Sequence, residues 1–121
     1  MWLIETGSKT KEQIADDSTS WGNYYNATFE YVNSSGSTVT KNENSGTKIP
    51  TGNTEYTKAN NIYDLAGNVY DWTMEAYSTS YRVYRGGYYN YSDGVPADYR
   101  YGSSPTNSYD IYGCRSALYI K

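Results

Sequence analysis

The residue types able to carry out chemistry in this chain are few, and they exclude several kinds of active site. The sequence contains no histidine, so a serine nucleophile would have no imidazole to take its proton. The only cysteine, Cys114, cannot form an internal disulfide. Free cysteines are among the most buried residue types, so we expect Cys114 to be a small buried residue.

Carboxylates remain as groups that could exchange protons. The candidates in the second half of the chain are Asp64, Asp71, Asp93 and Asp98. Two of them could pair in space as the acid and base of a glycosidase-type site. Nothing in their spacing favours such a pair, so this alternative stays open without support from the pattern.

Tyrosine is the most unusual feature of the composition. The chain has 17 Tyr and 3 Trp, and eleven of the tyrosines lie from Tyr77 onward. A core cannot absorb them all, because buried hydroxyls need hydrogen-bond partners. Tyr, Ser, Asn and Gly are typical of antibody paratopes, where they supply rigid amphipathic area and adaptable hydrogen bonds. The predicted ligand-binding residues are Tyr88, Tyr91, Asp93, Tyr99, Tyr101, Ser103, Asn107, Tyr109 and Tyr112.

A second interpretation of these tyrosines is a static surface, with ordinary ligand binding or a role in solubility alone. The elements that must position the surface are short in either case. A helix is predicted over 9–15, and strands over 28–32 and 37–41 are separated by turn residues 33–36. Residues 42–57 are expected to form a long surface loop.

The second half of the chain carries stronger strand patterns. A strand is predicted over 69–76 with Tyr70 and Trp72 on the same face, and further strands over 81–85 and 117–120. Short strands, long irregular loops and little helix indicate an α+β fold. The expected core residues are Leu65, Trp72, Val83, Tyr89, Leu118 and Ile120. The expected structural donors, tying loops together, are Arg85, Arg100 and Arg115.

Length and charge narrow the class of protein further. The chain has 121 residues, enough for one domain, and a net charge of −3 with no basic cluster, which argues against a nucleic-acid partner. No apolar run approaches the roughly 20 residues that span a bilayer. The apolar run at 2–4 is too short for a signal peptide. Localisation and oligomeric state are not indicated.

Several landmarks in the second half keep the order of a known family. They are Asn61–Thr73, Arg82–Gly87, Arg100, Pro105 and Gly113–Arg115. This pattern resembles the formylglycine-generating-enzyme (sulfatase-modifying-factor) family, a variant of the C-type lectin fold. The resemblance covers about residues 60–121, and upstream only Trp21-Gly22 matches. Family domains are longer, so residues 1–121 are expected to be one N-terminally truncated domain.

The resemblance also implies what chemistry is missing. The family's enzymes bind copper through two cysteines that follow the double glycine, and these positions fall on Tyr91 and Pro96. A related branch builds an iron site from histidines, and this chain has none. We therefore expect neither copper nor iron and no catalysis. The alternatives are a formylglycine-generating oxidase-like enzyme or a degenerate fragment that binds nothing.

The resemblance implies a structural Ca²⁺ site around the glycine turn. It maps to the side chains of Asp64 and Asp71 and the backbone carbonyls of Gly67 and Val69. Such hard oxygen donors suit Ca²⁺, although Asp71 is one carbon shorter than the family's usual Glu. In the alternative, Asp64 and Asn68 only stabilise the turn through local hydrogen bonds.

Some members of this family are binding proteins whose C-terminal segment is diversified by retroelements. Their Tyr-, Ser- and Asp-rich variable segment is similar to the region between the landmarks here. The resemblance therefore implies a binding or display module with a protein or glycan ligand, on a bacterial surface or phage particle. A nucleotide sequence with a nearby template copy would be needed to identify that type.

Overall fold

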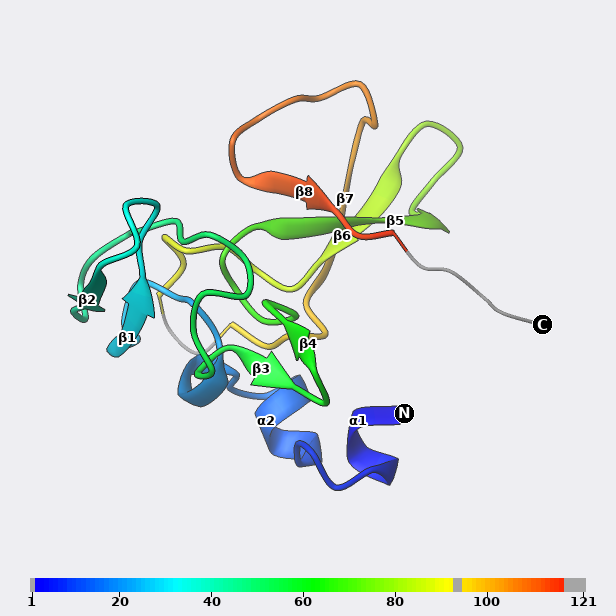
Figure 1. The fold of residues 1–121 in the computed structure, drawn as a ribbon. Helices are drawn as coiled ribbons and strands as arrows, with labels where there is room; N and C mark the ends of the chain where they lie inside the picture. The colour runs from blue at the N-terminus through cyan, green and yellow to red at the C-terminus, as the bar shows by residue number, and fades with distance from the viewer. Residues whose placement is uncertain (1, 93–94, 117–121) are drawn as a thin grey trace.

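Short strands and long loops make up most of the domain (Figure 1). The computed structural model describes residues 2–92 and 95–116. Helix there is limited to α1 (Trp2–Glu5), α2 (Lys11–Ala15) and the 3-10 turn η1 (Thr19–Trp21). This composition agrees with the predicted α+β class. None of the helices in the described ranges is long and apolar enough to cross a membrane.

The predicted helix at 9–15 is present but begins at Lys11. Thr10 is its N-cap: the Thr10 hydroxyl accepts from the Gln13 N–H at 3.2 Å, and the Thr10 N–H donates to the Gln13 side chain at 2.9 Å. This reciprocal pair satisfies two backbone groups that a helix start leaves open. Lys9 therefore precedes the helix.

Two hairpins follow the helices. The first, β1 (Phe29–Val32) and β2 (Thr38–Lys41), is antiparallel and confirms both strands predicted there. The second, β3 (Lys58–Ala59) and β4 (Ile62–Tyr63), was not predicted, because two-residue strands have no readable alternation. The loop between them is not purely a surface loop as expected, since Ile49 is only 4% exposed and packs with Phe29.

The largest element is a four-stranded sheet. Its strand order is β7 (Arg100–Ser103), β6 (Arg82–Arg85), β5 (Tyr70–Ala76) and β8 (Tyr112–Cys114). Only the β5–β8 pair is parallel. The strands predicted over 69–76 and 81–85 are confirmed, whereas β7 and β8 lie in a stretch expected to be irregular. The predicted strand at 117–120 lies outside the described residues.

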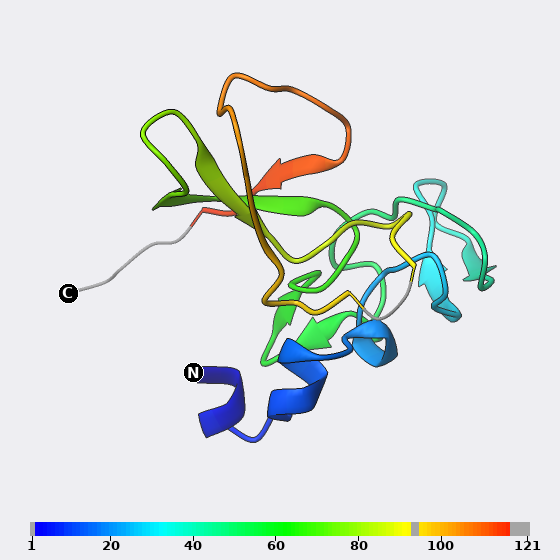
Figure 2. The same cartoon turned by 180° about the vertical axis from the view of Figure 1, so that it is seen from behind.

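The register of this sheet separates its two faces. Trp72 lies opposite Tyr84, which lies opposite Tyr101, so one face carries aromatic rings and is called the aromatic face. Asp71 lies opposite Arg85 on the other face, called the charged face. Figures 1 and 2 show this sheet on one side of the molecule and α1 and α2 on the other.

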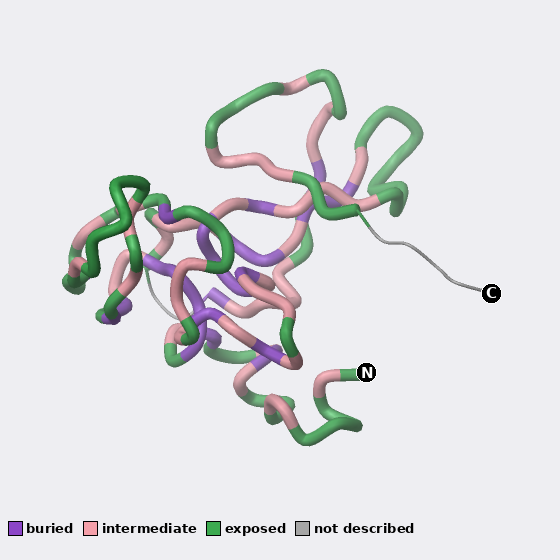
Figure 3. The backbone as a smooth tube through the Cα atoms, in the orientation of Figure 1, coloured by how far each residue is buried: buried purple, intermediate pink, exposed green. Residues whose placement is uncertain are grey.

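The buried core lies between the N-terminal segment and the sheet, where the buried stretches gather in Figure 3. Its largest members are Trp21 and Tyr24, each 1% exposed. The Trp21 indole N–H donates to the Gln13 carbonyl at 2.9 Å, and the Tyr24 hydroxyl donates to the Gly86 carbonyl at 2.8 Å. Each large aromatic therefore buries its ring with its polar atom satisfied.

The expected core residues divide into three groups. Val83 is fully buried, as predicted. Leu65, Trp72 and Tyr89 are only half-buried. The prediction for Trp72 was wrong in its depth, because the ring lies on the aromatic face instead of beneath it. Leu118 and Ile120 lie outside the described residues.

Lys41 fastens the first hairpin to the core. The residue is 2% exposed, and its ammonium donates to the carbonyls of Tyr24 and Ala27 at 2.7 and 2.8 Å. Burial lowers the pKa of Lys41 to about 8. The two carbonyls partly replace the water that the ammonium loses, so the lysine stabilises the loop from which they come.

Candidate functional site

A continuous cluster of aromatic rings covers the aromatic face. Its centre is Tyr70, which is 5% exposed and lies 4.5 Å from Tyr84 between ring centroids. Centroids of the other rings around Tyr70 lie 5.3 to 6.3 Å away, a spacing at which aromatic pairs attract. We call the following set the tyrosine cluster: Tyr70, Trp72, Tyr84, Tyr88, Tyr91, Tyr99, Tyr101 and Tyr112.

The rim of the tyrosine cluster is open to solvent. Tyr101 is 51% exposed and stacks on Tyr99 with centroids 6.4 Å apart. Tyr109 is 60% exposed and lies 5.7 Å from Tyr112. The centre of the tyrosine cluster is therefore packed, and the rings at its edge are accessible to solvent. Such an arrangement holds exposed contact residues in place on a packed base.

The structure brings most of the predicted ligand-binding residues together. The six predicted tyrosines are linked through ring contacts, as members of the cluster or, for Tyr109, at its edge. Ser103 and Asn107 form a separate pair, with the Asn107 amide donating to the Ser103 hydroxyl at 2.8 Å. Asp93 lies outside the described residues.

Sequence reasoning missed the part that Tyr70 and Tyr84 play in this surface. These two tyrosines are buried and hold the predicted contact residues by direct ring contact. The alternation over 69–76 places Tyr70 and Trp72 on the same face of a strand. This pattern could have indicated that Tyr70 belongs to the aromatic surface. The predicted ligand-binding tyrosines are therefore supported by two buried tyrosines that were not among the predicted residues.

Three hydroxyls of the cluster, those of Tyr70, Tyr84 and Tyr99, have raised pKa values. Burial raises the pKa of Tyr70 and of Tyr84 well above the usual value, and neighbouring tyrosines add to the effect. The hydrogen bond with Tyr91, followed by burial, raises the pKa of Tyr99 to about 12. At neutral pH these three hydroxyls are protonated and can both donate and accept hydrogen bonds.

The charged face is held by shared ion pairs. Arg85 and Arg100 both bind the Glu75 carboxylate, at 2.9 and 2.8 Å, and Arg85 donates to the Asp98 carbonyl at 3.0 Å. Arg115, directly after β8, binds the Asp71 carboxylate at 2.9 Å. The expected role of the three arginines as structural donors is confirmed.

Asp64 lies in a position that is costly for a carboxylate. It is 4% exposed, and within the described part of the chain neither carboxylate oxygen has a hydrogen-bond partner. The buried Thr57 hydroxyl is unpartnered as well. Burial raises the pKa of Asp64, while the Thr57 and Thr51 hydroxyls, the Arg115 charge and the Gly52 N–H act more weakly in the opposite direction. These donors lie near the carboxylate without forming a hydrogen bond of normal geometry. An unpaired buried carboxylate destabilises a fold unless a cation compensates it.

These residues fit a hard cation only in part. Buried oxygens of Asp64 and Thr57 are suitable ligands for Ca²⁺. Asp71 is instead bound by Arg115, which also donates to the Asp64 backbone carbonyl at 3.0 Å. Across residues 2–92 and 95–116, no group of three or more His, Cys, Asp or Glu side chains could hold a metal. Asp64 is thus the strongest member of the predicted site.

The backbone members of the predicted site lie on a tight turn. Gly67 has φ +71°, and its N–H donates to the Gly86 carbonyl at 2.7 Å. Val69 is half-buried and starts the run into β5. Both follow Asp64 closely along the chain.

Asn68 does not act as a local turn former. Its side-chain amide donates to the Ile49 carbonyl, and its oxygen accepts from the Ile49 N–H and the Asn23 amide. These partners lie 19 and 45 residues away. The alternative of local hydrogen bonds is therefore wrong for Asn68, which instead links three segments of the chain.

A family of known proteins matches most of this chain. The sequence profile described as "Sulfatase-modifying factor enzyme 1-like domain" matches residues 6–120. The chain belongs to this family. The match begins well upstream of Asn61, so it also includes the first half of the chain, where few residues of the family pattern can be recognised. No curated protein and no solved structure matches the chain significantly.

The two positions implied as copper ligands in this family are structural here. The Tyr91 ring belongs to the tyrosine cluster, and its carbonyl accepts from the Tyr25 N–H at 2.8 Å. The Pro96 carbonyl accepts from the Tyr99 N–H at 3.0 Å. Neither side chain can supply a thiolate.

Cys114 is exposed, which corrects the expectation that it is buried. It lies on β8, at the edge of the sheet among the described strands, opposite Trp72 on β5. A short edge strand leaves its terminal side chain open to solvent, whatever the general preference of free cysteine for the interior.

The acid pair considered for glycosidase chemistry gains no support. Asp64 is buried, and Asp71 forms an ion pair with Arg115. Asp98 is half-buried, and Asp93 lies outside the described residues.

Proposed function

We propose that this member of the sulfatase-modifying factor family is a non-catalytic binding domain. The tyrosine cluster and its rim would form the contact surface for a protein or glycan, on a C-type-lectin-like scaffold. The observation that carries the proposal is which residues occupy the two positions where the family's enzymes have copper-binding cysteines. Pro96 supplies no ligand, and Tyr91 extends a continuous aromatic platform.

Physical arguments favour binding on this surface. Tyrosine offers large contact area and a polar handle at low conformational cost. The packed centre holds the exposed rings of Tyr101 and Tyr109 in place before a ligand arrives, which reduces the entropy lost on binding. Neutral hydroxyls suit recognition of polar, uncharged groups.

A diversified origin of this surface is part of the proposal. The candidate contact residues lie between landmarks such as Gly87, Arg100 and Gly113 and not on them. A reverse transcriptase gene beside an imperfect copy of codons 82–121 would support it. A genomic neighbourhood with neither would contradict this part and leave the binding proposal intact. A bacterial surface or phage particle is the corresponding location.

The purified protein is expected not to oxidise a sulfatase-type cysteine peptide when copper is supplied. The reason is the absence of two thiolates to bind Cu(I). Mass spectrometry of the peptide after incubation measures conversion to formylglycine. Copper-dependent conversion that is lost in Cys114→Ser would favour the oxidase alternative.

Alanine substitutions at the rim and at the centre of the cluster are expected to have different effects. Tyr101→Ala and Tyr109→Ala should change the free energy of unfolding by no more than about 0.5 kcal/mol, because both are exposed. Tyr70→Ala should cost about 3–5 kcal/mol, as for other buried aromatics. Tyr91→Ala is expected to destabilise too, since its ring contacts Tyr70.

Binding of the rim variants then tests function. A ligand selected with the unmodified domain from displayed proteins or arrayed glycans should bind Tyr101→Ala or Tyr109→Ala more weakly, by about 2 kcal/mol at one position. Unchanged affinity for both variants would move the contact surface elsewhere. A domain that selects no ligand would favour the degenerate-fragment alternative.

A further inference from the structure

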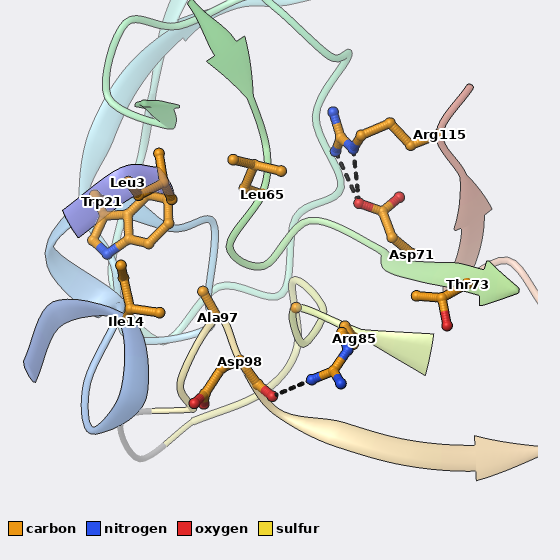
Figure 4. Close-up of a pocket in the computed structure, with 11 residues that line it drawn as sticks. Leu3, Ile14, Trp21, Leu65, Asp71, Thr73, Arg85, Ala97, Asp98 and Arg115 are labelled. Carbon is orange, nitrogen blue, oxygen red and sulfur yellow. Dashed lines mark hydrogen bonds and ion pairs between the residues drawn. The ribbon is translucent and has the colours of Figure 1, made fainter. Parts of the chain in front are cut away.

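A cavity of about 360 Å³ is lined by Asp71 and Arg85 of the charged face (Figure 4). The register of the main sheet places the tyrosine cluster on the opposite face. Its walls come from the N-terminal segment on one side and from β5 and β6 on the other. Small-molecule sites commonly occupy about 300–1,000 Å³ and combine apolar walls with a few fixed polar groups. The cavity has both features.

One end of the cavity is apolar and rigid. Leu3, Ile14 and Trp21 form it together with Leu65 and Ala97. Ile14 and Trp21 belong to the packed core, at 4% and 1% exposure. Because the Trp21 indole N–H is already bonded to the Gln13 carbonyl, the ring presents carbon atoms to the cavity. This end suits an aromatic or branched aliphatic group.

The other end contains the Arg85 guanidinium, whose side chain is 36% exposed. Its described contacts are one bond to a neutral backbone carbonyl and one to Glu75. Glu75 is shared with Arg100, so two guanidinium groups face a single carboxylate. This network retains one positive charge, and Arg85 keeps N–H groups that these contacts do not use.

Two further carboxylates line the cavity, but neither forms an ion pair with Arg85. Asp71 forms an ion pair with Arg115, with Nη2 and Nε at 2.9 and 3.0 Å from one oxygen. The Asp98 carboxylate points away from the Arg85 guanidinium, which binds the Asp98 backbone oxygen (Figure 4). The polar end at Arg85 therefore favours an anion over a cation.

We propose that this cavity binds a small organic carboxylate with an apolar body. The apolar group would lie against Ile14 and Trp21, and the carboxylate would accept hydrogen bonds from Arg85. A planar guanidinium can bind a carboxylate through two parallel bonds, which gives orientation as well as affinity. This site is separate from the tyrosine cluster and does not depend on its function.

The test uses the full chain and two probes of nearly equal shape, 3-phenylpropionate and its neutral amide, 3-phenylpropionamide. Calorimetric titration is expected to show the acid binding at least about 10-fold more tightly, because hydrogen bonds to an ionised acceptor are the stronger ones. Equal affinity for both probes, or no binding of either, would overturn the proposal. This comparison needs no variant and is unaffected by loss of folding.

Variants then locate the site. Ala97→Phe, which fills the apolar end, should abolish binding of the acid, and Arg85→Gln should reduce its affinity to that of the amide. Tyr101→Ala, on the other face, should bind both probes as the unmodified chain does. Binding of the acid that survives Ala97→Phe would overturn the proposal. So would a concentration-dependent dimer that the acid does not dissociate, because a second copy of the chain would then cover the cavity.

Discussion

Replacing Asp64 with asparagine is expected to stabilise the metal-free protein by about 1–3 kcal/mol. Asp64 is a buried carboxylate without a hydrogen-bond partner in the described structure, and groups of this kind cost free energy of that order. The amide keeps the shape and removes the charge. Urea denaturation in EDTA measures the difference. Asp110→Asn, at a side chain 72% exposed, is the matched control and should change little.

Ca²⁺ should offset most or all of the stability advantage of Asp64→Asn. At about 100 times its Kd, a ligand that binds only the folded state stabilises it by roughly 2.7 kcal/mol. Unmodified protein should gain stability in millimolar Ca²⁺, whereas Asp64→Asn should not. Identical melting curves for unmodified protein in Ca²⁺ and in EDTA would reject the cation site. They would leave Asp64 as a destabilising residue without a ligand.

The pH dependence of the free energy of unfolding, compared between the unmodified protein and Asp64→Asn, gives an independent check. Burial raises the pKa of Asp64 in the folded state above its unfolded value. The folded state therefore binds more protons between the two pKa values, and the unfavourable contribution disappears as pH falls through the folded pKa. Metal-free protein should gain stability relative to Asp64→Asn on mild acidification. An unchanged difference between them would contradict the burial of this charge.

Gly67→Ala is expected to prevent folding. Gly67 has φ +71°, and a Cβ there would lie 2.2 Å from the Asn23 backbone carbonyl oxygen. The left-handed conformation alone costs about 1–2 kcal/mol for alanine, and the clash requires movement of backbone that a buried network holds. A total above about 3 kcal/mol is comparable with the whole stability of a small domain. Circular dichroism and urea titration measure the loss.

Gly36→Ala is the matched control for this substitution. Gly36 has φ +83°, but a Cβ there meets nothing within 4 Å. It should therefore lose only the conformational cost of about 1–2 kcal/mol and remain folded. If the two variants were equally stable, the close approach of the turn to Asn23 would be absent in solution.

The comparison of Gly36 with Gly67 illustrates what could be predicted. Both lie in turns recognised from residue type, at Asn33–Gly36 and Ala66–Asn68, and both turns are present. Residue type alone does not distinguish them, because the difference is the distance to a chain segment more than 40 residues away. The same limit applies to Asn68, whose hydrogen bonds depend on where Asn23 and Ile49 lie.

The sequence by itself determined the properties that depend on residue type and local order. Alternation located β5 and β6, and ordered landmarks identified the family that residues 6–120 match. The absence of histidine and of a cysteine pair argued against imidazole and paired-thiolate chemistry. These conclusions need no knowledge of distant contacts.

Only the tertiary structure decided burial and partnership. Tyr91 and Tyr101 have the same side chain, yet one contacts the buried Tyr70 and the other is 51% exposed. Asp64 and Asp71 were predicted as one pair, but Arg115, reached through the parallel pairing of β8 with β5, binds Asp71 and leaves Asp64 alone. Free energies of burial and charge depend on what surrounds a group in space, and here the surroundings come from segments far apart in the chain.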